Sequence, residues 1–93
     1  MNKNFFEYLV EFLGTFIFLS VIIVTGNPIA IGLTLTAMIY FGGSVSGGHF
    51  NPAVNLLMLV NKKINTTQFI GQTVAQLLGA LAAYCYFKLV HKK

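Results

Sequence analysis

Apolar residues fill most of this chain in three long blocks that are separated by short polar stretches. The blocks lie at about residues 6–25, 29–45 and 67–90. A helix needs about 20 apolar residues to cross a bilayer. The pattern therefore predicts three transmembrane helices, and we expect residues 1–93 to form a single domain.

The polar stretches between the blocks carry turn and capping signals. Gly26-Asn27-Pro28 predicts a tight turn, with its proline at the first position of the second helix. The connector Asn61-Lys62-Lys63-Ile64-Asn65 precedes the third block, and Thr66 or Thr67 is expected to cap that helix.

The first block differs from a signal peptide in two respects. Glu7 and Glu11 interrupt its start, and no small-residue cleavage site follows it cleanly. We therefore expect it to be a retained spanning helix.

A fourth apolar piece, at residues 53–60, is too short to span. At 1.5 Å per residue it covers roughly 12 Å, less than half of a hydrocarbon core of about 30 Å. It either lies on the membrane surface or dips in and returns. Backbone without helical hydrogen bonds is tolerated at membrane depth only where protein or a water-filled cavity covers it.

The sequence "SGGHFNPAV", residues 46–54, precedes this piece and suits a re-entrant segment of residues 46–60. Its glycines let the chain turn without Cβ clashes, and its extended part would offer carbonyl oxygens to a file of water. Asn51 and Pro52 occupy the cap and first position of a short helix. The Asn51 amide and the positive helix end would then hold an oxygen atom and disfavour cations. A solvated loop with an ordinary Asn-Pro cap explains the same residues, and their chemistry alone leaves both interpretations open.

Composition favours a membrane protein over a soluble helical domain. The chain is 56% hydrophobic and only 9% charged, against about a quarter charged in ordinary soluble domains. A soluble fold of this size could not bury so much apolar surface. The positive charge comes only from scattered lysines, so we expect membrane lipid rather than nucleic acid as a partner.

The lysines give no preferred orientation in the membrane. With a cytoplasmic N-terminus, three lysines would lie inside and three outside, namely Lys3, Lys62 and Lys63 against Lys88, Lys92 and Lys93. The positive-inside rule is then balanced. This balance suits a protein that inserts in both orientations, and it also arises by chance in a gene fragment.

The sequence shows no pattern that indicates an enzyme. His49 has no Cys or Asp near it that would complete a metal site, and no nucleophile-base set or phosphate loop is present. We therefore expect no catalytic residue, metal or cofactor. Cys85 lies within an apolar block and is interpreted as a small packing residue.

Small residues recur every fourth position in the third block, at Gly71, Ala75, Gly79 and Ala83. Such a stripe allows two helices to approach closely. It would form either a seam inside the chain, which we favour, or a seam between subunits. Gln72 and Gln76 are expected to add interhelical hydrogen bonds, while the leucines at 77, 78 and 81 face lipid or neighbouring protomers.

In these residues the chain resembles the aquaporin and glycerol-facilitator family, the major intrinsic proteins. The matching strings are "SGGHFNPAV", "EFLGTFIFL" in the first block, "AIGLTLTAMIYFGG" in the second and "AQLLGALAA" in the third. The match is continuous over roughly residues 7 to 87 but covers only the first of the two inverted repeats of that family. The resemblance implies an all-α, multi-pass integral protein of the cell membrane: an aquaporin-like half-repeat with three transmembrane helices and one re-entrant half-helix.

The resemblance also implies roles for individual residues. The side chain of Asn51 would line the pore, the preceding residues would offer carbonyls to solute, and Glu11 and Gln76 would support the re-entrant backbone. From the residues alone, Glu11 could instead snorkel near the inner interface, where Glu7 is expected. The residues placed along the solute path are Gly47, Gly48, His49, Phe50, Asn51, Pro52, Ala53, Val54 and Ile31.

The chain departs from the family pattern in ways that put the solute filter in doubt. Ile31 stands where the family has an aromatic residue, and the chain has no arginine. Asn55 stands where a threonine usually follows the motif. The second repeat is also missing from this sequence.

The leading hypothesis is a passive channel for water or a small neutral solute. Because one repeat cannot enclose a pore, it would be completed by a second copy, as an antiparallel homo-oligomer, or by a complementary second-half chain. One alternative is a small dual-topology, proton-coupled exporter that uses Glu11 as its proton site. Another is a truncated half-channel that does not conduct.

Overall fold

The computed structural model describes residues 3–91, and all regular structure in that range is helical. The elements are α1 (Lys3–Thr25), α2 (Pro28–Ser46), α3 (Pro52–Val60) and α4 (Thr66–Val90). Helices α1, α2 and α4 are long and apolar enough to cross a bilayer. The three predicted spans and the short fourth helix are therefore confirmed. Lys92 and Lys93 lie outside the described residues.

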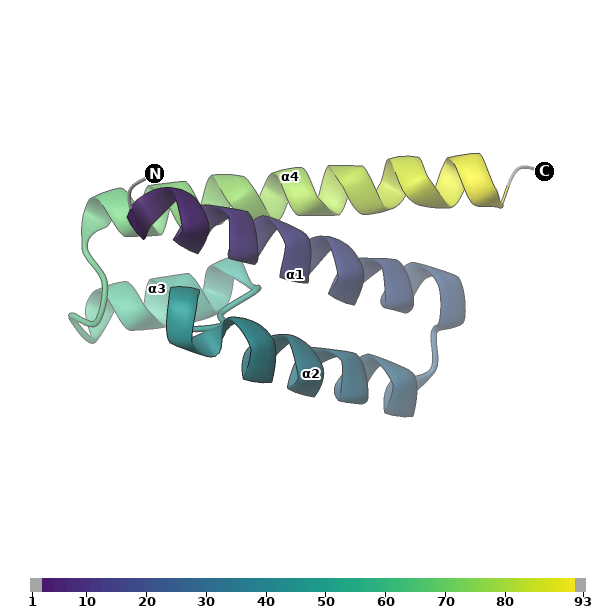
Figure 1. Cartoon of the computed structure of the whole chain (residues 1–93), viewed down its shortest axis with the longest axis horizontal. Coiled ribbons are helices and arrows are strands. Elements are labelled where there is room, and N and C mark those ends of the chain that lie inside the picture. The colour runs from purple at the N-terminus through teal and green to yellow at the C-terminus, as the bar shows by residue number, and fades with distance from the viewer. Residues whose placement is uncertain (1–2, 92–93) are drawn as a thin grey trace.

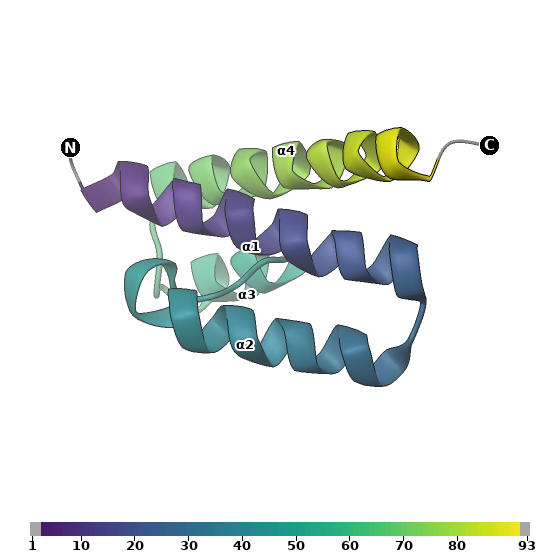
Figure 2. The same cartoon turned by 45° about the vertical axis from the view of Figure 1, so that its right-hand side comes forward.

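The helices form a bundle built around α1, which packs against both α2 and α4. Helices α1 and α2 run antiparallel, and α1 and α4 run side by side with their N-terminal ends together (Figures 1 and 2). Helix α3 packs against α4 and occupies only one end of the bundle, the end that holds the chain's N-terminus. The two termini lie at opposite ends (Figure 1).

Local capping explains where α2 and α4 begin. The Asn27 side chain accepts a hydrogen bond from the Ala30 amide at 2.9 Å, and Pro28 follows it in the first turn of α2. Asn65 caps α4 by accepting from the Gln68 amide at 2.8 Å, while Gln68 Oε1 accepts from the Asn65 amide at 3.0 Å. This is a capping box, so the prediction that Thr66 or Thr67 caps this helix is wrong.

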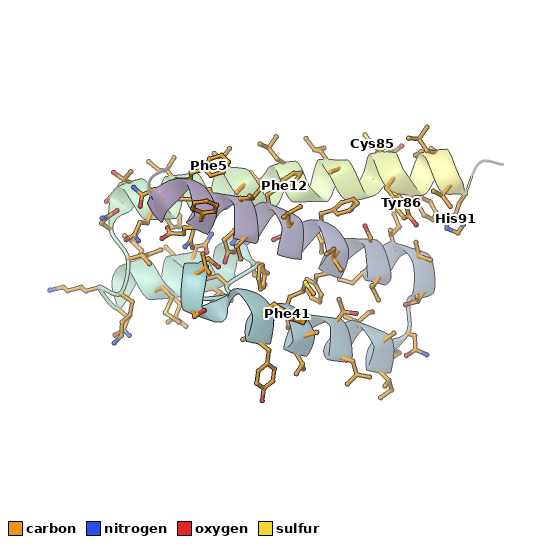
Figure 3. All side chains as sticks on the ribbon, viewed as in Figure 1. Phe5, Phe12, Phe41, Cys85, Tyr86 and His91 are labelled. Atoms are coloured by element: carbon orange, nitrogen blue, oxygen red, sulfur yellow. The ribbon has the colours of Figure 1, made fainter. Side chains whose placement is uncertain are left out.

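The small-residue stripe of α4 packs against α1. Ala75, Gly79 and Ala83 are all buried. A Cβ atom on Gly79 would lie 2.8 Å from the Phe12 carbonyl oxygen, so the two backbones are close there. The seam inside the chain is therefore confirmed. Cys85, in contrast, is exposed on the outer face of α4 and is not a packing residue within this bundle (Figure 3).

Polar residues dominate the interior and apolar residues dominate the surface. Among the described residues, the buried hydrophobic side chains are Phe50, Ala75 and Ala83. The buried polar and charged residues are more numerous: Glu7, Glu11, Thr15, Ser46, His49, Asn55, Gln72 and Gln76. Leu77, Leu78 and Leu81 are more than half exposed, as predicted. This inverted pattern suits a bilayer, which solvates apolar side chains and leaves polar groups to be satisfied by the protein.

Candidate functional site

Residues 46–60 enter the bundle and leave it at the same end. Helix α2 ends at Ser46, residues 47–51 run into the bundle without helical structure, and α3 returns to the starting end (Figures 1 and 2). His49 and Phe50 are buried, which a solvated loop would not allow. The re-entrant interpretation is therefore the correct one.

Positive φ angles produce the reversal at the end of α2. Gly47 has φ 92° and Gly48 has φ 67°, a region that favours glycine. Phe50 has φ 53°, which is unusual for a residue with a large side chain. Its strained backbone is held by packing and by a hydrogen bond from its amide.

The Glu11 carboxylate holds this backbone from α1. Its Oε2 accepts from the Ser46 hydroxyl at 2.6 Å and from the His49 amide at 3.1 Å. Its Oε1 accepts from the Phe50 amide at 2.7 Å and from Gln76 Nε2 at 2.7 Å. The carboxylate is 0% exposed, so these four donors replace the water it has lost. The structure thus brings together the two residues expected to support the segment, and it places Glu11 inside the bundle and not at an interface.

The Phe50 ring fits into a notch that only glycine can form. A Cβ atom on Gly14 would lie 2.2 Å from Phe50 Cε1, and one on Gly42 would lie 3.3 Å from its Cζ. The ring therefore anchors the re-entrant segment between α1 and α2. Sequence reasoning assigned only a carbonyl role to Phe50 and missed Gly14, although that glycine lies one helical turn after Glu11.

A network of buried amides lies behind the segment. Asn55 Nδ2 donates to Gln76 Oε1 at 2.7 Å and to Thr73 Oγ1 at 3.0 Å. Asn55 Oδ1 accepts from Gln76 Nε2 at 3.1 Å and lies 3.0 Å from His49 Nδ1. Gln72 Oε1 lies 2.7 Å from the same ring nitrogen. Asn55 was noted in the sequence only as a departure, yet it is fully buried at the centre of this network.

Glu7 belongs to the same polar interior. Gln68 Nε2 donates to its Oε2 at 3.2 Å, and Gln72 Nε2 donates to its Oε1 at 3.3 Å. The side chain is 4% exposed, so it turns into the bundle and not out to the interface where it was expected. A buried carboxylate in a membrane helix is costly without such partners.

Asn51 lies where the re-entrant segment meets α3. Its Oδ1 accepts from the Ala53 amide at 2.8 Å and caps the helix, with Pro52 next in the chain. The side chain is exposed, and its Nδ2 has no hydrogen-bond partner among residues 3–91. The amide group is thus available to a molecule from outside this protomer.

A cavity of about 410 Å³ adjoins Asn51, and we call it the central cavity. It lies between α1 and α4, beyond the N-terminal end of α3. Thr15, on its wall, is 2% exposed, and its hydroxyl has no partner among the described residues. The full lining is Thr15, Phe18, Leu19, Ile22, Phe50, Asn51, Pro52, Gln76, Leu77 and Ala80.

A second cavity, of about 460 Å³, adjoins the end where the re-entrant segment enters, and we call it the vestibule. Its wall includes His49, Gly47 and the buried Glu7, with Lys63 from the connector. Its remaining lining is Ser44, Val45, Ser46, Met58, Ile64 and Gln68. Polar groups therefore face both the vestibule and the central cavity, on either side of the segment.

The remaining predicted path residues do not all gather here. Ala53 is exposed and Val54 is partly buried in the first turn of α3. Ile31 lies in the first turns of α2, at the end of the bundle away from α3, and is partly buried. The structure therefore brings Gly47, Gly48, His49 and Phe50 together with Glu11 and leaves Ile31 apart from them.

Comparisons with known proteins point to one family. The family model described as Major intrinsic protein matches residues 23–93. The chain is 46% identical over 86 residues to Glycerol uptake facilitator protein-like 6 of Lactiplantibacillus plantarum, covering 83% of this chain and 40% of that protein. It is 39% identical over 105 residues to Aquaporin NIP3-1 of Arabidopsis thaliana, covering 97% of this chain and 32% of the relative.

A third relative, Aquaporin Z of Brucella melitensis, is 48% identical over 58 residues, which cover 62% of this chain and 25% of that protein. The chain thus spans at most about two fifths of the length of these curated relatives. No solved structure matches the chain. The family match and the three apolar helices together identify an integral, multi-pass membrane protein that belongs to the major intrinsic protein family.

Proposed function

We propose that this chain forms part of a passive transmembrane channel for water or a small neutral solute. A second, antiparallel copy or a complementary chain completes the pore. The observation that carries the proposal is the position of Asn51, at the inner end of the re-entrant segment with its amide Nδ2 unpaired beside the central cavity. The N-terminal end of α3 adds a partial positive charge at this point, which favours an oxygen atom and disfavours cations.

The need for a partner follows from what one protomer leaves open. Asn51 and Pro52 are exposed, and the Thr15 hydroxyl beside them is unpaired. An unpaired amide such as that of Asn51 cannot face lipid without a cost of several kcal/mol, and the enclosed Thr15 hydroxyl lacks a partner within the protomer. Two oppositely oriented copies would cover this face of each other, in the manner of an inverted repeat.

The names of the relatives support a channel and not an enzyme. They include a glycerol uptake facilitator and several aquaporins. The exporter alternative receives no support from the site, because Glu11 is fully buried and its oxygens are occupied by four donors. A carboxylate in that position holds the re-entrant backbone in place.

The function is tested by stopped-flow swelling of vesicles that contain the purified protein. Water flux above that of empty vesicles is expected, and Asn51→Asp should introduce a cation leak. The aspartate keeps the oxygen that caps α3, removes the NH₂ donor and adds a negative charge. Asn61→Asp, at the opposite end of α3, is the matched control and should cause no leak. Vesicles that swell no faster than empty ones would show a half-channel that does not conduct.

Cross-linking tests the antiparallel pair. Leu77 is 55% exposed near the middle of α4 and lines the central cavity, whereas Leu89 lies near the end of that helix. In an antiparallel pair the two-fold axis lies in the membrane plane, so only residues near the middle of a helix, such as Leu77, contact the same residue of the second copy. In a Cys85→Ser background, Leu77→Cys should form disulfide-linked dimers and Leu89→Cys should not. Dimers through Leu89→Cys would indicate parallel copies.

A further inference from the structure

Two chains of hydrogen bonds start at buried carboxylates and converge on one ring nitrogen. The first starts at Glu11, whose Oε1 accepts from Gln76 Nε2 at 2.7 Å. Gln76 Oε1 accepts from Asn55 Nδ2 at 2.7 Å, so the Asn55 nitrogen points toward Gln76. The Asn55 oxygen is therefore the atom that faces His49 Nδ1, at 3.0 Å.

The second chain starts at Glu7. Gln72 Nε2 donates to Glu7 Oε1 at 3.3 Å and to the Ser46 carbonyl oxygen at 3.1 Å. These two acceptors fix the orientation of the Gln72 amide. Its Oε1 then faces the same His49 Nδ1, at 2.7 Å.

Two amide oxygens on Nδ1 require that this nitrogen carry a proton. A neutral imidazole has one N–H donor and one acceptor nitrogen, so the other nitrogen, Nε2, keeps its lone pair. We propose that Asn55 and Gln72 are a positioning pair that fixes His49 as the Nδ1–H tautomer. Together they present Nε2 as a permanent hydrogen-bond acceptor at the vestibule.

The surroundings of Nε2 fit this role. It lies beside Gly47, where an added Cβ atom would be 2.7 Å away, and both residues line the vestibule. Nε2 has no partner among residues 3–91. Within residues 3–91, the fully enclosed side-chain nitrogen and oxygen atoms without a hydrogen-bond partner are Thr15 Oγ1 and Ser20 Oγ. Nε2 is not one of them although it also has no partner, so it is not enclosed and stays accessible from the vestibule. The charged groups that face it there are Glu7 and Lys63.

The residue at position 55 matters because of its donor count. An asparagine amide supplies two N–H donors and one acceptor oxygen. Asn55 donates to Gln76 and Thr73, and its oxygen faces His49 Nδ1 while also accepting from Gln76 Nε2. A threonine hydroxyl has a single donor and could not hold all three groups in this arrangement.

This inference deepens the proposed channel function and, for its effect on transport, rests on it. A solute passing from the vestibule would meet an acceptor at His49 Nε2 and later a donor at Asn51 Nδ2. It must therefore both donate and accept hydrogen bonds, as water and hydroxyl compounds do. Solutes that only accept hydrogen bonds cannot bind to the acceptor His49 Nε2.

Nitrogen NMR tests the tautomer without reference to transport. The chain has two histidines, so ¹⁵N-labelled His91→Gln protein in lipid nanodiscs reports on His49 alone. Near neutral pH we expect a protonated Nδ1 and an unprotonated Nε2. A ring protonated on Nε2, alone or together with Nδ1, would overturn the proposal. This spectrum decides the question even if the variants below do not fold.

The positioning pair is then tested in the same background. Asn55→Thr combined with Gln72→Met removes both amide oxygens from Nδ1 and should release the ring to a mixture of tautomers. Gln68→Met is the control, because Gln68 donates to Glu7 but does not touch His49. An unchanged spectrum in the double variant, with helix content retained, would contradict the role of the pair.

Vesicle swelling separates this inference from the channel proposal. Loss of one oriented hydrogen bond corresponds to a factor of roughly five in an equilibrium, so the double variant should lower water flux by about that factor. A parent protein with the expected spectrum but no water flux would remove the channel function and leave the tautomer assignment intact. Normal flux in a double variant with mixed tautomers would show that Nε2 does not contact the solute.

Discussion

The two ends of the bundle are built in different ways. At the N-terminal end, α3 fills the space between the long helices, and the side chains behind it form a closed hydrogen-bond network around Glu11, His49 and Asn55. At the other end no helix from residues 3–91 takes the place of α3 (Figure 1). There the walls of α1 and α4 border the central cavity and an apolar groove of about 370 Å³, lined by Phe16, Ile17, Ser20, Val21, Val24, Thr25 and Tyr86.

This difference shows which part of the protomer is complete by itself. In a bilayer, burial of apolar groups contributes little to helix association, so packing and satisfied polar groups must hold the bundle together. The N-terminal end has both. The opposite end has exposed apolar walls and two enclosed hydroxyls, of Thr15 and Ser20, without partners among the described residues. Under the proposed function, a second copy would supply what this end lacks.

The largest loss of stability is expected for Glu11→Ala. The substitution leaves the amides of His49 and Phe50 buried without an acceptor, and each such group costs about 1–3 kcal/mol. The free energy of unfolding in mixed micelles should fall by at least about 2 kcal/mol. Ile17→Ala is the control on the same helix, because this side chain is 40% exposed at the open end. Equal losses for both variants would mean that the two ends do not differ in the way described.

A smaller loss is expected for Gly14→Ala. The added methyl group would lie 2.2 Å from the Phe50 ring, and overpacking of this kind typically costs about 1–3 kcal/mol. Phe50→Leu in the same chain should recover part of that loss by vacating the notch.

Gly32→Ala is the matched control, since nothing lies within 4 Å of a Cβ atom there. It should leave the stability unchanged or raise it slightly. The unfolding free energies of the parent, the two single variants and the double variant form a double-mutant cycle, with Gly32→Ala as a fifth chain for control. Strict additivity of Gly14→Ala and Phe50→Leu would argue against the notch.

The sequence predicted the elements well because each long block matches the length of a bilayer and each boundary carries Gly, Asn or Pro. For residues 46–60 the chemistry of the residues left a re-entrant segment and a solvated loop open, and only the family resemblance favoured the re-entrant segment that the structure shows. The expected interhelical hydrogen bonds of Gln72 and Gln76 are present, but their link to His49 through Asn55 was not foreseen. Hydrogen bonds between Asn55, Gln72 and His49 join residues 6 and 23 positions apart, and no local pattern encodes them.

The absence of any local signal for long-range contacts also explains the wrong or missing predictions for individual residues. Glu7 lies one turn into α1, where a carboxylate could equally well reach the interface, and only the position of Gln68 and Gln72 on α4 turns it inward. Cys85 lies in a block that is apolar on all sides, so no polar face indicates which side of the helix packs against the bundle. The Gly14 notch depends on a ring that is 36 residues away in the chain.

The smallest expected effect is that of Thr15→Val, and it bears directly on the open end. The Thr15 hydroxyl is enclosed without a partner, so replacing it with a methyl group of similar size should raise the stability of an isolated protomer by roughly 1 kcal/mol. If a second copy closes the central cavity, the hydroxyl would gain a partner or a bound water in the assembly. The gain should then disappear in lipid at high protein content, where pairs form, while it remains in dilute micelles. Unfolding measured in both conditions checks this, with Thr36→Val as the control, because that exposed hydroxyl already donates to the Gly32 carbonyl oxygen at 2.8 Å. An equal gain in both conditions would place Thr15 outside any contact between copies and would weaken the case for an antiparallel pair.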